Sequence, residues 1–267
     1  MTDERPLTPN IAEGSPDRFG YSWDRYATLL PVHEEQFLRW TAQDKSFWKG
    51  LRFLDGGCGI GRNSYWPMTY GALGGVAVDV DDRTLRRAQR NLETFSEVEV
   101  RKQSIYEISE KDAFDVAFSI GVVHHLADPD AAVGRLTRAT KPGGQVLVWL
   151  YGRENNGWII YLFNPARRAL FSRLPLRLVH LLSWPLTALL WGALRLGLPP
   201  GAYYRLVRRF SFDHLRAIVF DHMIPRIALY YTRAQAEALL GRAGLVDIRA
   251  NWVNENSWSV IGRKPGP

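Results

Sequence analysis

The stretch FLDGGCGIGRN, residues 53–63, places four glycines within six positions directly after a short apolar run. Glycine costs conformational entropy on folding, but it reaches left-handed backbone conformations and lets another molecule approach the main chain closely. Residues 49–54 predict a strand, and a helix is expected to start near Asn63. A glycine-rich turn between a strand and a helix can hold a nucleotide-like ligand against backbone N–H groups. The stretch therefore predicts a ligand-binding turn after a first strand.

The chain from residue 49 to residue 150 alternates short apolar runs with helical stretches. This alternation is typical of βαβ units around a parallel sheet. The expected strands are Arg52–Asp55, Gly75–Asp79, Val98–Lys102, Asp115–Ser119 and Gln145–Leu150. Because Pro and Gly do not easily continue a helix, Lys141-Pro-Gly-Gly144 is expected to end a helix and turn into the fifth strand.

Two helical patterns and a hairpin extend this arrangement. Asp82 and Thr232 are each expected to cap a helix. The apolar faces of these helices are Leu85, Ala88, Leu92 and Phe95 in the first, and Ala236, Leu239, Leu240 and Ala243 in the second. Two strand-like runs, Val246–Val253 and Ser257–Arg263, are separated by Asn254-Glu-Asn256, which predicts a hairpin. The predicted fold class is α/β, a doubly wound and mostly parallel sheet.

The composition limits the classes of protein to consider. With 46% hydrophobic and 23% charged residues, 267 residues suit one large domain or one domain with an insertion. A single cysteine, Cys58, excludes an internal disulfide and a cysteine-built zinc site, and favours a cytoplasmic location. We expect no metal, because no carboxylate and histidine cluster has ligand spacing. Residues 1–17 lack the apolar segment of a secretory signal and are expected to form a loose tail.

The net charge of +7 comes from one segment of the chain. From Asn155 to Phe212 there are eight arginines and no Asp or Glu, so removing this +8 leaves the other residues at −1. The arginines are Arg167, Arg168, Arg173, Arg177, Arg195, Arg205, Arg208 and Arg209. Residues 178–194 carry no charged side chain, but these seventeen residues, interrupted by Pro185, are fewer than the roughly 20 that a spanning helix needs. A helical insertion is therefore predicted.

Three interpretations of this insertion remain open. It can form a helical lid over a substrate pocket, with its arginines in solvent. Residues 158–209 can instead dock on an anionic membrane surface, with Trp184 and Trp191 at headgroup depth. This second interpretation would place the protein peripherally on the inner face of the membrane and would allow a lipid-linked substrate. Finally, the arginines would also attract the phosphates of a nucleic acid.

The order of motifs carries a family resemblance. Asp55-x-Gly57-x-Gly59-x-Gly61, followed eighteen residues later by Asp79, resembles the cofactor loop of class I S-adenosylmethionine-dependent methyltransferases. The segment from Phe114 to Pro129, followed by Lys141-Pro-Gly-Gly144, is similar to the fourth-strand and post-strand motifs of that superfamily. Residues 19–26, 151–155 and 257–264 resemble a bacterial small-molecule subgroup. The resemblance implies a Rossmann-like class I methyltransferase fold with a helical insertion after the fifth strand.

The resemblance also implies roles for single residues. Asp55 and the glycine loop (residues 56–61) would pass the methionine end of S-adenosylmethionine, Asp79 would accept hydrogen bonds from the ribose, and Val80 would lie on the adenine. Many relatives carry an Asp for the adenine amino group where this chain has Gln103-Ser-Ile105, so Ser104 or a backbone group must substitute. The expected cofactor residues are Asp55, Gly57, Cys58, Gly59, Gly61, Asp79, Val80, Ser104, Ile105 and Ser119.

Two adjacent histidines, His124 and His125, are the candidate catalytic bases. They follow the fourth expected strand, near the place where relatives hold their acceptors, and imidazole titrates near neutrality. One of the pair, His125, can instead brace its loop through a hydrogen bond. The aromatic residues that can line the acceptor pocket are Tyr21, Trp23, Tyr151, Tyr230 and Tyr231.

The function predicted on this basis is direct methyl transfer from S-adenosylmethionine to a small, lipophilic or lipid-linked acceptor. One alternative is a membrane-associated protein that binds the cofactor without turnover, and another is a nucleic-acid methyltransferase. The latter lacks its chemistry, since Ser119-Ile-Gly-Val122 stands where base-methylating enzymes carry Asn/Asp-Pro-Pro-aromatic. The expected organisation is a tail and helical cap (1–48), an α/β core (49–154), the insertion (155–231) and a C-terminal helix and hairpin (232–267).

Overall fold

The computed structural model of the chain describes residues 15–198 and 200–266. Of the expected N-terminal tail, residues 1–14 lie outside the described residues. The last two positions of that tail, residues 16 and 17, belong to helix α1 (Pro16–Arg25), so the tail prediction is wrong at this end.

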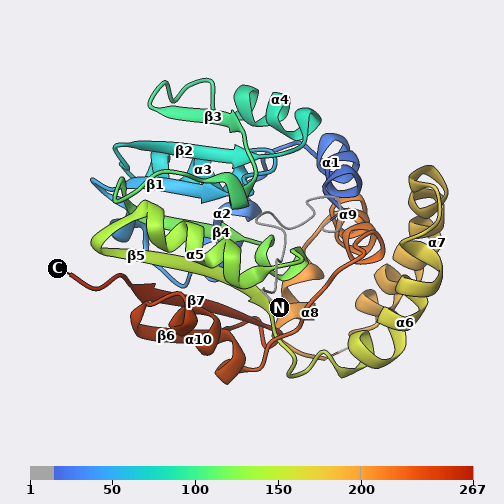
Figure 1. Ribbon diagram of the computed structural model, residues 1–267. Coiled ribbons are helices and arrows are strands. Elements are labelled where there is room, and N and C mark those ends of the chain that lie inside the picture. Colours follow the sequence, from blue (N-terminus) through green and yellow to red (C-terminus); the bar gives the residue numbers. More distant parts are fainter. Residues whose placement is uncertain (1–14, 199, 267) are drawn as a thin grey trace, which may run out of the picture.

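A seven-stranded sheet runs through the molecule in the order β3-β2-β1-β4-β5-β7-β6 (Figure 1). The strands are β1 (Arg52–Gly56), β2 (Gly74–Asp79), β3 (Val98–Lys102), β4 (Phe114–Ile120), β5 (Thr140–Tyr151), β6 (Val246–Val253) and β7 (Ser257–Arg263). Strands β1 to β5 pair in parallel, and β7 pairs antiparallel with β5 and β6. The order reverses between β1 and β4, where open α/β sheets bind their ligands. The predicted fold class is confirmed, and each expected strand lies within an observed one.

Alternate residues of the central strands enter two separate cores. Leu54, Val76 and Val78 pack on one face with helices α5 (Pro129–Ala139) and α10 (Arg233–Arg242). Phe53 and Ala77 pack on the other face with the aromatic and aliphatic side chains of four helices. These helices are α2 (Val32–Thr41), η2 (Lys45–Trp48), α3 (Arg62–Thr69) and α4 (Asp82–Asn91). Because both faces are covered, the sheet presents only its ends and edges to ligands.

Two of the predicted helix starts are determined by capping groups. The N-cap of α4 is Asp81 rather than Asp82, because the Asp81 carboxylate accepts hydrogen bonds from the backbone N–H groups of Arg83 and Thr84. The prediction of Asp82 is therefore wrong by one residue. Thr232 caps α10 as expected, in a capping box with Gln235 at its third position.

The segment Lys141-Pro-Gly-Gly144 also differs from its prediction. Helix α5 ends before it, at Ala139, and β5 already begins at Thr140. The segment thus lies inside β5, at the point where the register with β4 shifts between Phe114 and Val116. The Pro and Gly residues interrupt the ladder locally instead of separating the helix from the strand.

The insertion between β5 and α10 is helical, as predicted. It contains the π-helical segments η5 (Ile159–Phe163) and η6 (Arg167–Phe171), and helices α6 (Asn164–Ala166), α7 (Leu176–Arg195), α8 (Ala202–Val207) and α9 (Phe212–Met223). Figure 1 shows α7 at the outer edge of the molecule, with α9 between it and the ends of the parallel strands. Helices α7 and α9 pack against each other. Within residues 15–198 and 200–266, no helix is long and apolar enough to cross a bilayer.

The arginines of the insertion do not behave as one group. Arg167 is fully buried, whereas Arg168, Arg173 and Arg177 are exposed, as are the four that follow them. Arg167 therefore cannot meet a lipid headgroup or a phosphate at the surface, and the expectation that all eight arginines are available is wrong for this residue.

Candidate active site

The glycine loop connects β1 to α3 and lies against β2. The backbone N–H groups of Gly57 and Cys58 both donate to the carbonyl oxygen of Val78, at 2.9 Å each. Gly57 has φ +88°, and a Cβ at this position would lie 2.5 Å from Cγ2 of Val122, so only glycine fits. Gly59 also has a positive φ, +54°, but a Cβ there would have no atom within 4 Å. The loop is therefore packed tightly behind Gly57 and open above Gly59.

Asp79, the last residue of β2, holds the open side of the loop. Its Oδ2 accepts a hydrogen bond from the Gly59 N–H at 2.9 Å. Its Oδ1 accepts from the N–H groups of Val80 (2.8 Å) and Asp81 (3.1 Å). Burial raises the pKa of Asp79, and these backbone donors oppose that effect. Oδ1 also accepts a long hydrogen bond from the Thr84 hydroxyl, at 3.4 Å. Oδ2, which accepts the Gly59 N–H, has a second lone pair for a donor from a ligand.

Two of the predicted cofactor residues support the loop from inside the fold. Asp55 is fully buried and accepts a hydrogen bond at Oδ2 from the Ser64 hydroxyl, at 2.7 Å. Burial raises the pKa of Asp55 to about 7. The Ser119 hydroxyl donates to the carbonyl oxygen of Gly56 at 2.6 Å and is equally buried. The Asp55 bond joins β1 to α3 on the two sides of the loop, and the Ser119 bond holds the carbonyl of Gly56; neither side chain lines the cavity in front of the loop.

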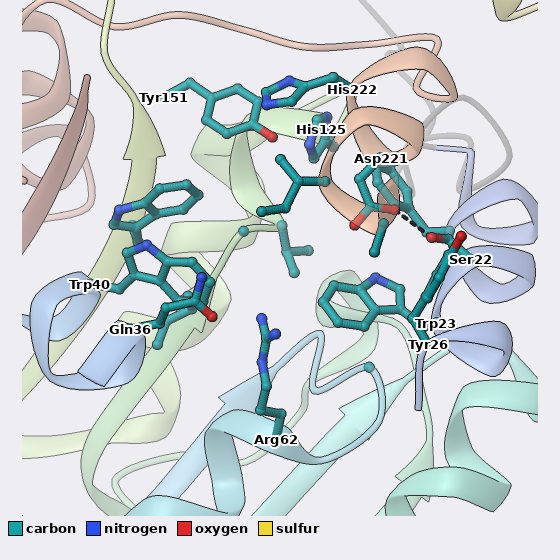
Figure 2. Close-up of a pocket in the computed structure, with 18 of the residues that line it drawn as sticks. Ser22, Trp23, Tyr26, Gln36, Trp40, Arg62, His125, Tyr151, Asp221 and His222 are labelled. Atoms are coloured by element: carbon teal, nitrogen blue, oxygen red, sulfur yellow. Dashed lines mark hydrogen bonds between the residues drawn. The ribbon is translucent and has the colours of Figure 1, made fainter. Parts of the chain in front are cut away.

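A cavity of about 1310 Å³ extends from the glycine loop into the insertion. Its walls come from α1, α2, the ends of β2 and β4, and the helices α7, α8 and α9. Figure 2 shows labelled side chains from α1, α2, β5 and α9 around one central space. Small-molecule pockets usually measure about 300–1,000 Å³. The cavity is therefore large enough for a nucleotide-like ligand together with a second molecule.

The structure brings most of the predicted site residues together around this cavity. The lining includes Gly57, Cys58, Gly59, Asp79, Val80, Ser104, Ile105 and His125. The lining does not include Asp55, Gly61, Ser119 or His124. Of the aromatic candidates, Trp23, Tyr151 and Tyr230 line the cavity, but Tyr21 and Tyr231 do not. Ser104 also caps the short helix η3 (Ile105–Glu107), in a capping box with Glu107.

The two histidines occupy different environments in η4 (Val123–His125). His124 is fully buried behind the cavity wall, with its ring 3.9 Å from that of Tyr151. His125 lines the cavity, and its Nδ1 lies 2.7 Å from the carbonyl oxygen of Ile227, which makes it a donor to that carbonyl. Burial lowers the pKa of both imidazoles, in His125 to about 3. His125 therefore braces its loop, which was the alternative considered for it, while its other ring nitrogen is available toward the cavity.

Several polar residues of the cavity were not predicted as site residues, among them Arg62, Asp221 and His222. Arg62, the first residue of α3, points into the cavity between the rings of Trp23 (4.9 Å) and Trp40 (5.2 Å) (Figure 2). Burial lowers its pKa to about 10. Asp221 and His222, near the end of α9, line the opposite side. Arg62 directly follows the last glycine of the loop, so the motif could have indicated it as a site residue. No local pattern in the sequence marks Asp221 or His222.

These features define a nucleotide-type site at the switch point of a doubly wound sheet, and similarity to known proteins identifies its class. The methyltransferase domain family matches residues 54–148. The ubiquinone biosynthesis O-methyltransferase of Dechloromonas aromatica is 30% identical over 159 residues, which cover 56% of this chain and 68% of that protein. The protein of the same name from Pseudomonas putida is 31% identical over 143 residues, covering 52% of this chain and 61% of that protein.

Solved structures show the same fold. The magnesium protoporphyrin IX methyltransferase of Synechocystis, with bound S-adenosylhomocysteine, has a TM-score of 0.57 at 16% identity and covers 94% of this chain and 98% of its own. Human N-acetylserotonin methyltransferase, in complex with S-adenosylmethionine, has a TM-score of 0.55 at 16% identity, over 93% of this chain and 56% of its own. The chain belongs to the class I S-adenosylmethionine-dependent methyltransferases. It is an enzyme, and S-adenosylmethionine is its methyl donor.

Proposed function

We propose that the chain transfers a methyl group to a hydroxyl oxygen of a lipophilic acceptor that it collects at a membrane surface. The observation that carries this proposal is the continuity of the cavity from the glycine loop into the apolar interior of the insertion. The apolar lining there is Ile159, Phe163, Leu186, Leu190, Leu206 and Val207. Such a lining suits an apolar body whose reactive end is oriented by a few polar groups. The names of the relatives, which are O-methyltransferases of ubiquinone biosynthesis, support oxygen as the acceptor atom.

The residues around the glycine loop fit the methyl donor. The open space above Gly59 admits a ligand against the backbone, and Asp79 beside it can accept from ribose hydroxyls. Val80 and Ile105 supply apolar contacts for the adenine, with Ser104 at its edge. The guanidinium of Arg62 suits the carboxylate of the methionine end, because a buried cation gains most from an anionic partner. Asp55, Gly61 and Ser119 would act indirectly, by holding the loop.

The bound donor supplies a methyl group that is already activated on a sulfonium sulfur. The remaining task of the protein is to align an acceptor oxygen with that carbon and to exclude water, which accounts for most of the acceleration in such transfers. The aromatic rings of Trp23, Tyr151 and Tyr230 line the cavity, and their apolar faces would help to exclude water. Their faces can also stabilise a cationic centre.

The outer surface of the insertion supports membrane docking. Among the described residues, eleven of the fourteen large apolar side chains that are strongly exposed lie between residues 158 and 198. On α7, Leu178, Leu181 and Leu189 follow one another at helical spacing, with Trp184 at the edge of the stripe. Monomeric proteins rarely expose an apolar surface of this kind without a partner. The exposed Arg177 and Arg195 lie near the two ends of α7, and residues 155–212 contain no Asp or Glu, so an anionic bilayer is the complement of this surface.

Two assays test the proposal. In the first, the protein is incubated with methyl-labelled S-adenosylmethionine and a panel of alkyl catechols and alkyl amines dispersed in detergent. We expect labelled methyl ethers, with KM falling as the alkyl chain lengthens. Transfer only to amines or only to water-soluble catechols would contradict the proposed acceptor.

The second assay addresses the membrane surface. The intact protein is sedimented with vesicles of phosphatidylglycerol and, separately, of phosphatidylcholine. Binding to the anionic vesicles alone is expected, and it should weaken as salt rises, because charge attraction at a surface is screened. If the intact protein sediments with neither vesicle, docking is wrong and the insertion acts as a lid only.

A further inference from the structure

Asp221 lies at a position in its helix where a carboxylate is electrostatically unfavourable. It lies two residues before the end of helix α9 (Phe212–Met223), where the partial negative charge of the helix C-terminus repels a carboxylate. The side chain is also half-buried in the cavity wall instead of extending into solvent. A residue that conflicts with its local environment and faces a cavity is typical of a functional site.

Specific contacts hold this carboxylate in place. The hydroxyl of Ser22, on α1, donates to Oδ1 of Asp221 at 2.5 Å. Figure 2 shows this bond and shows Asp221 directed at the same central space as His125, Tyr151 and His222. Because α1 belongs to the N-terminal cap and α9 to the insertion, the contact joins two segments that are 199 residues apart.

The surroundings of Asp221 bring the pKa of its carboxyl close to neutral pH. Burial raises the pKa of its carboxyl to about 6, while the hydrogen bond from Ser22 and the positive charge of Arg62 oppose the rise. The pKa values of Tyr26 and Tyr151 are raised mainly by burial, and the charge of Asp221 raises them further. His222, the next residue, is held neutral by burial and by the charge of Arg167.

The other ionisable groups of the cavity are less suited to accept a proton. Asp79 accepts several backbone hydrogen bonds and belongs to the donor site. His125 is too weak a base, because burial lowers its pKa to about 3. Asp213 and Glu255 also line the cavity, but their residues are exposed to solvent. A general base works best when its pKa lies near the pH of the reaction and it is within reach of the acceptor proton.

We propose that Asp221 is the general base that takes the proton from the acceptor hydroxyl, and that Ser22 is a positioning residue that fixes its orientation. This inference rests on the proposed function, since only a hydroxyl acceptor needs a base. The acceptor O–H bond breaks and its proton passes to the Asp221 carboxylate, while the oxygen lone pair forms the bond to the methyl carbon. The carbon–sulfur bond breaks with its electron pair staying on sulfur, which leaves a neutral thioether. The proton then leaves Asp221 for solvent, so charge and atoms balance.

The test compares Asp221→Asn with Asp247→Asn, which removes an exposed carboxylate from β6, away from the cavity lining. Calorimetry with S-adenosylhomocysteine first shows that each variant folds and binds. We expect donor-site affinity within about twofold of wild type in both variants. With an alkyl catechol, kcat should fall roughly 10²- to 10⁴-fold in Asp221→Asn, and it should stay within about threefold in Asp247→Asn. Ser22→Ala should lower kcat by a smaller factor and leave KM for the acceptor unchanged.

A pH profile separates a base from a merely structural residue. The Asp221→Asn variant should regain activity about tenfold per pH unit as the catechol ionises by itself, whereas the wild type should level off above pH 7. A kcat that is unchanged in Asp221→Asn would overturn the proposal. A large loss of S-adenosylhomocysteine affinity with normal kcat would also overturn it and would assign Asp221 to the donor's ammonium group. If the wild type methylates no hydroxyl compound, the proposed function itself fails.

Discussion

The open space above Gly59 makes a quantitative prediction about the methyl donor. In Gly59→Ala, the new Cβ would meet no protein atom within 4 Å, yet it would enter the cavity in front of the glycine loop. Gly143→Ala is the matched control. Gly143 has φ +79°, a Cβ there would also have no neighbour within 4 Å, and it lies in β5 away from the cavity.

Both substitutions place an L-residue in a left-handed conformation. Each should therefore lower the free energy of unfolding by about 1 kcal/mol, which corresponds to a fall in Tm of about 2–4 °C for a chain of this size. Only Gly59→Ala adds a methyl group to a ligand contact. Overpacking of that kind costs about 1–3 kcal/mol. The dissociation constant for S-adenosylmethionine should thus rise roughly 5- to 150-fold.

Two measurements are made on each variant. Thermal unfolding of one sample gives Tm, and calorimetric titration of a separate folded sample with S-adenosylmethionine gives the dissociation constant. The expected pattern is equal loss of stability and unequal loss of affinity. If Gly59→Ala binds the donor as tightly as Gly143→Ala does, the donor does not approach the loop at Gly59, and the assignment of the loop as its cradle is wrong.

Two further predictions follow from the exposed stripe on α7 and from the buried titratable groups. Replacing the exposed Leu181 and Leu189 together by Ser should leave Tm almost unchanged. The double variant should bind phosphatidylglycerol vesicles roughly 100-fold more weakly, because each leucine contributes about 1.5 kcal/mol. Binding equal to that of the wild type would exclude this stripe from the membrane contact. Stability should fall as pH drops from 6.5 to 4.5, because burial lowers the pKa of His33 to about 2 and of His125 to about 3, so both stay neutral in the fold and take up protons in the unfolded chain. His214 and His222, with pKa values lowered to about 4, act in the same direction. Asp55 and Asp221, with pKa values raised to about 7 and about 6, oppose this by two protons. The net effect of these six groups is therefore about 2.7 kcal/mol per pH unit, and urea unfolding midpoints that rise on acidification would contradict it.

The parts of the site that the sequence predicts are those that adjacent residues build. The glycine loop and Asp79 follow directly from strands that the apolar pattern marks, and the parallel sheet then brings their ends together. The error at the cap of α4 has the same local origin, since Asp81 and Asp82 are adjacent and only backbone geometry decides between them. Arg62 could have been predicted in the same way, because it directly follows the last glycine of the loop.

The acceptor side could not be predicted in this way. Asp221 reaches the cavity because α9 packs between α7 and the end of the sheet, and its partner Ser22 lies 199 residues earlier. Likewise, the charge pattern made all eight arginines of the insertion equivalent, but tertiary packing buried Arg167 and left the others at the surface. His124 and His125 are adjacent in sequence, yet the turn of η4 places only His125 on the cavity. Such distinctions depend on long-range packing, which no local pattern reports.

The most direct test of the account is a crystal structure of the full chain with S-adenosylhomocysteine and an alkyl catechol. We predict the ribose on Asp79, the amino-acid end between the glycine loop and Arg62, and the catechol hydroxyl at the Asp221 carboxylate, with its alkyl chain among the apolar side chains of the insertion. A nucleoside bound away from the glycine loop, or a catechol hydroxyl remote from Asp221 with its alkyl chain in solvent, would contradict it.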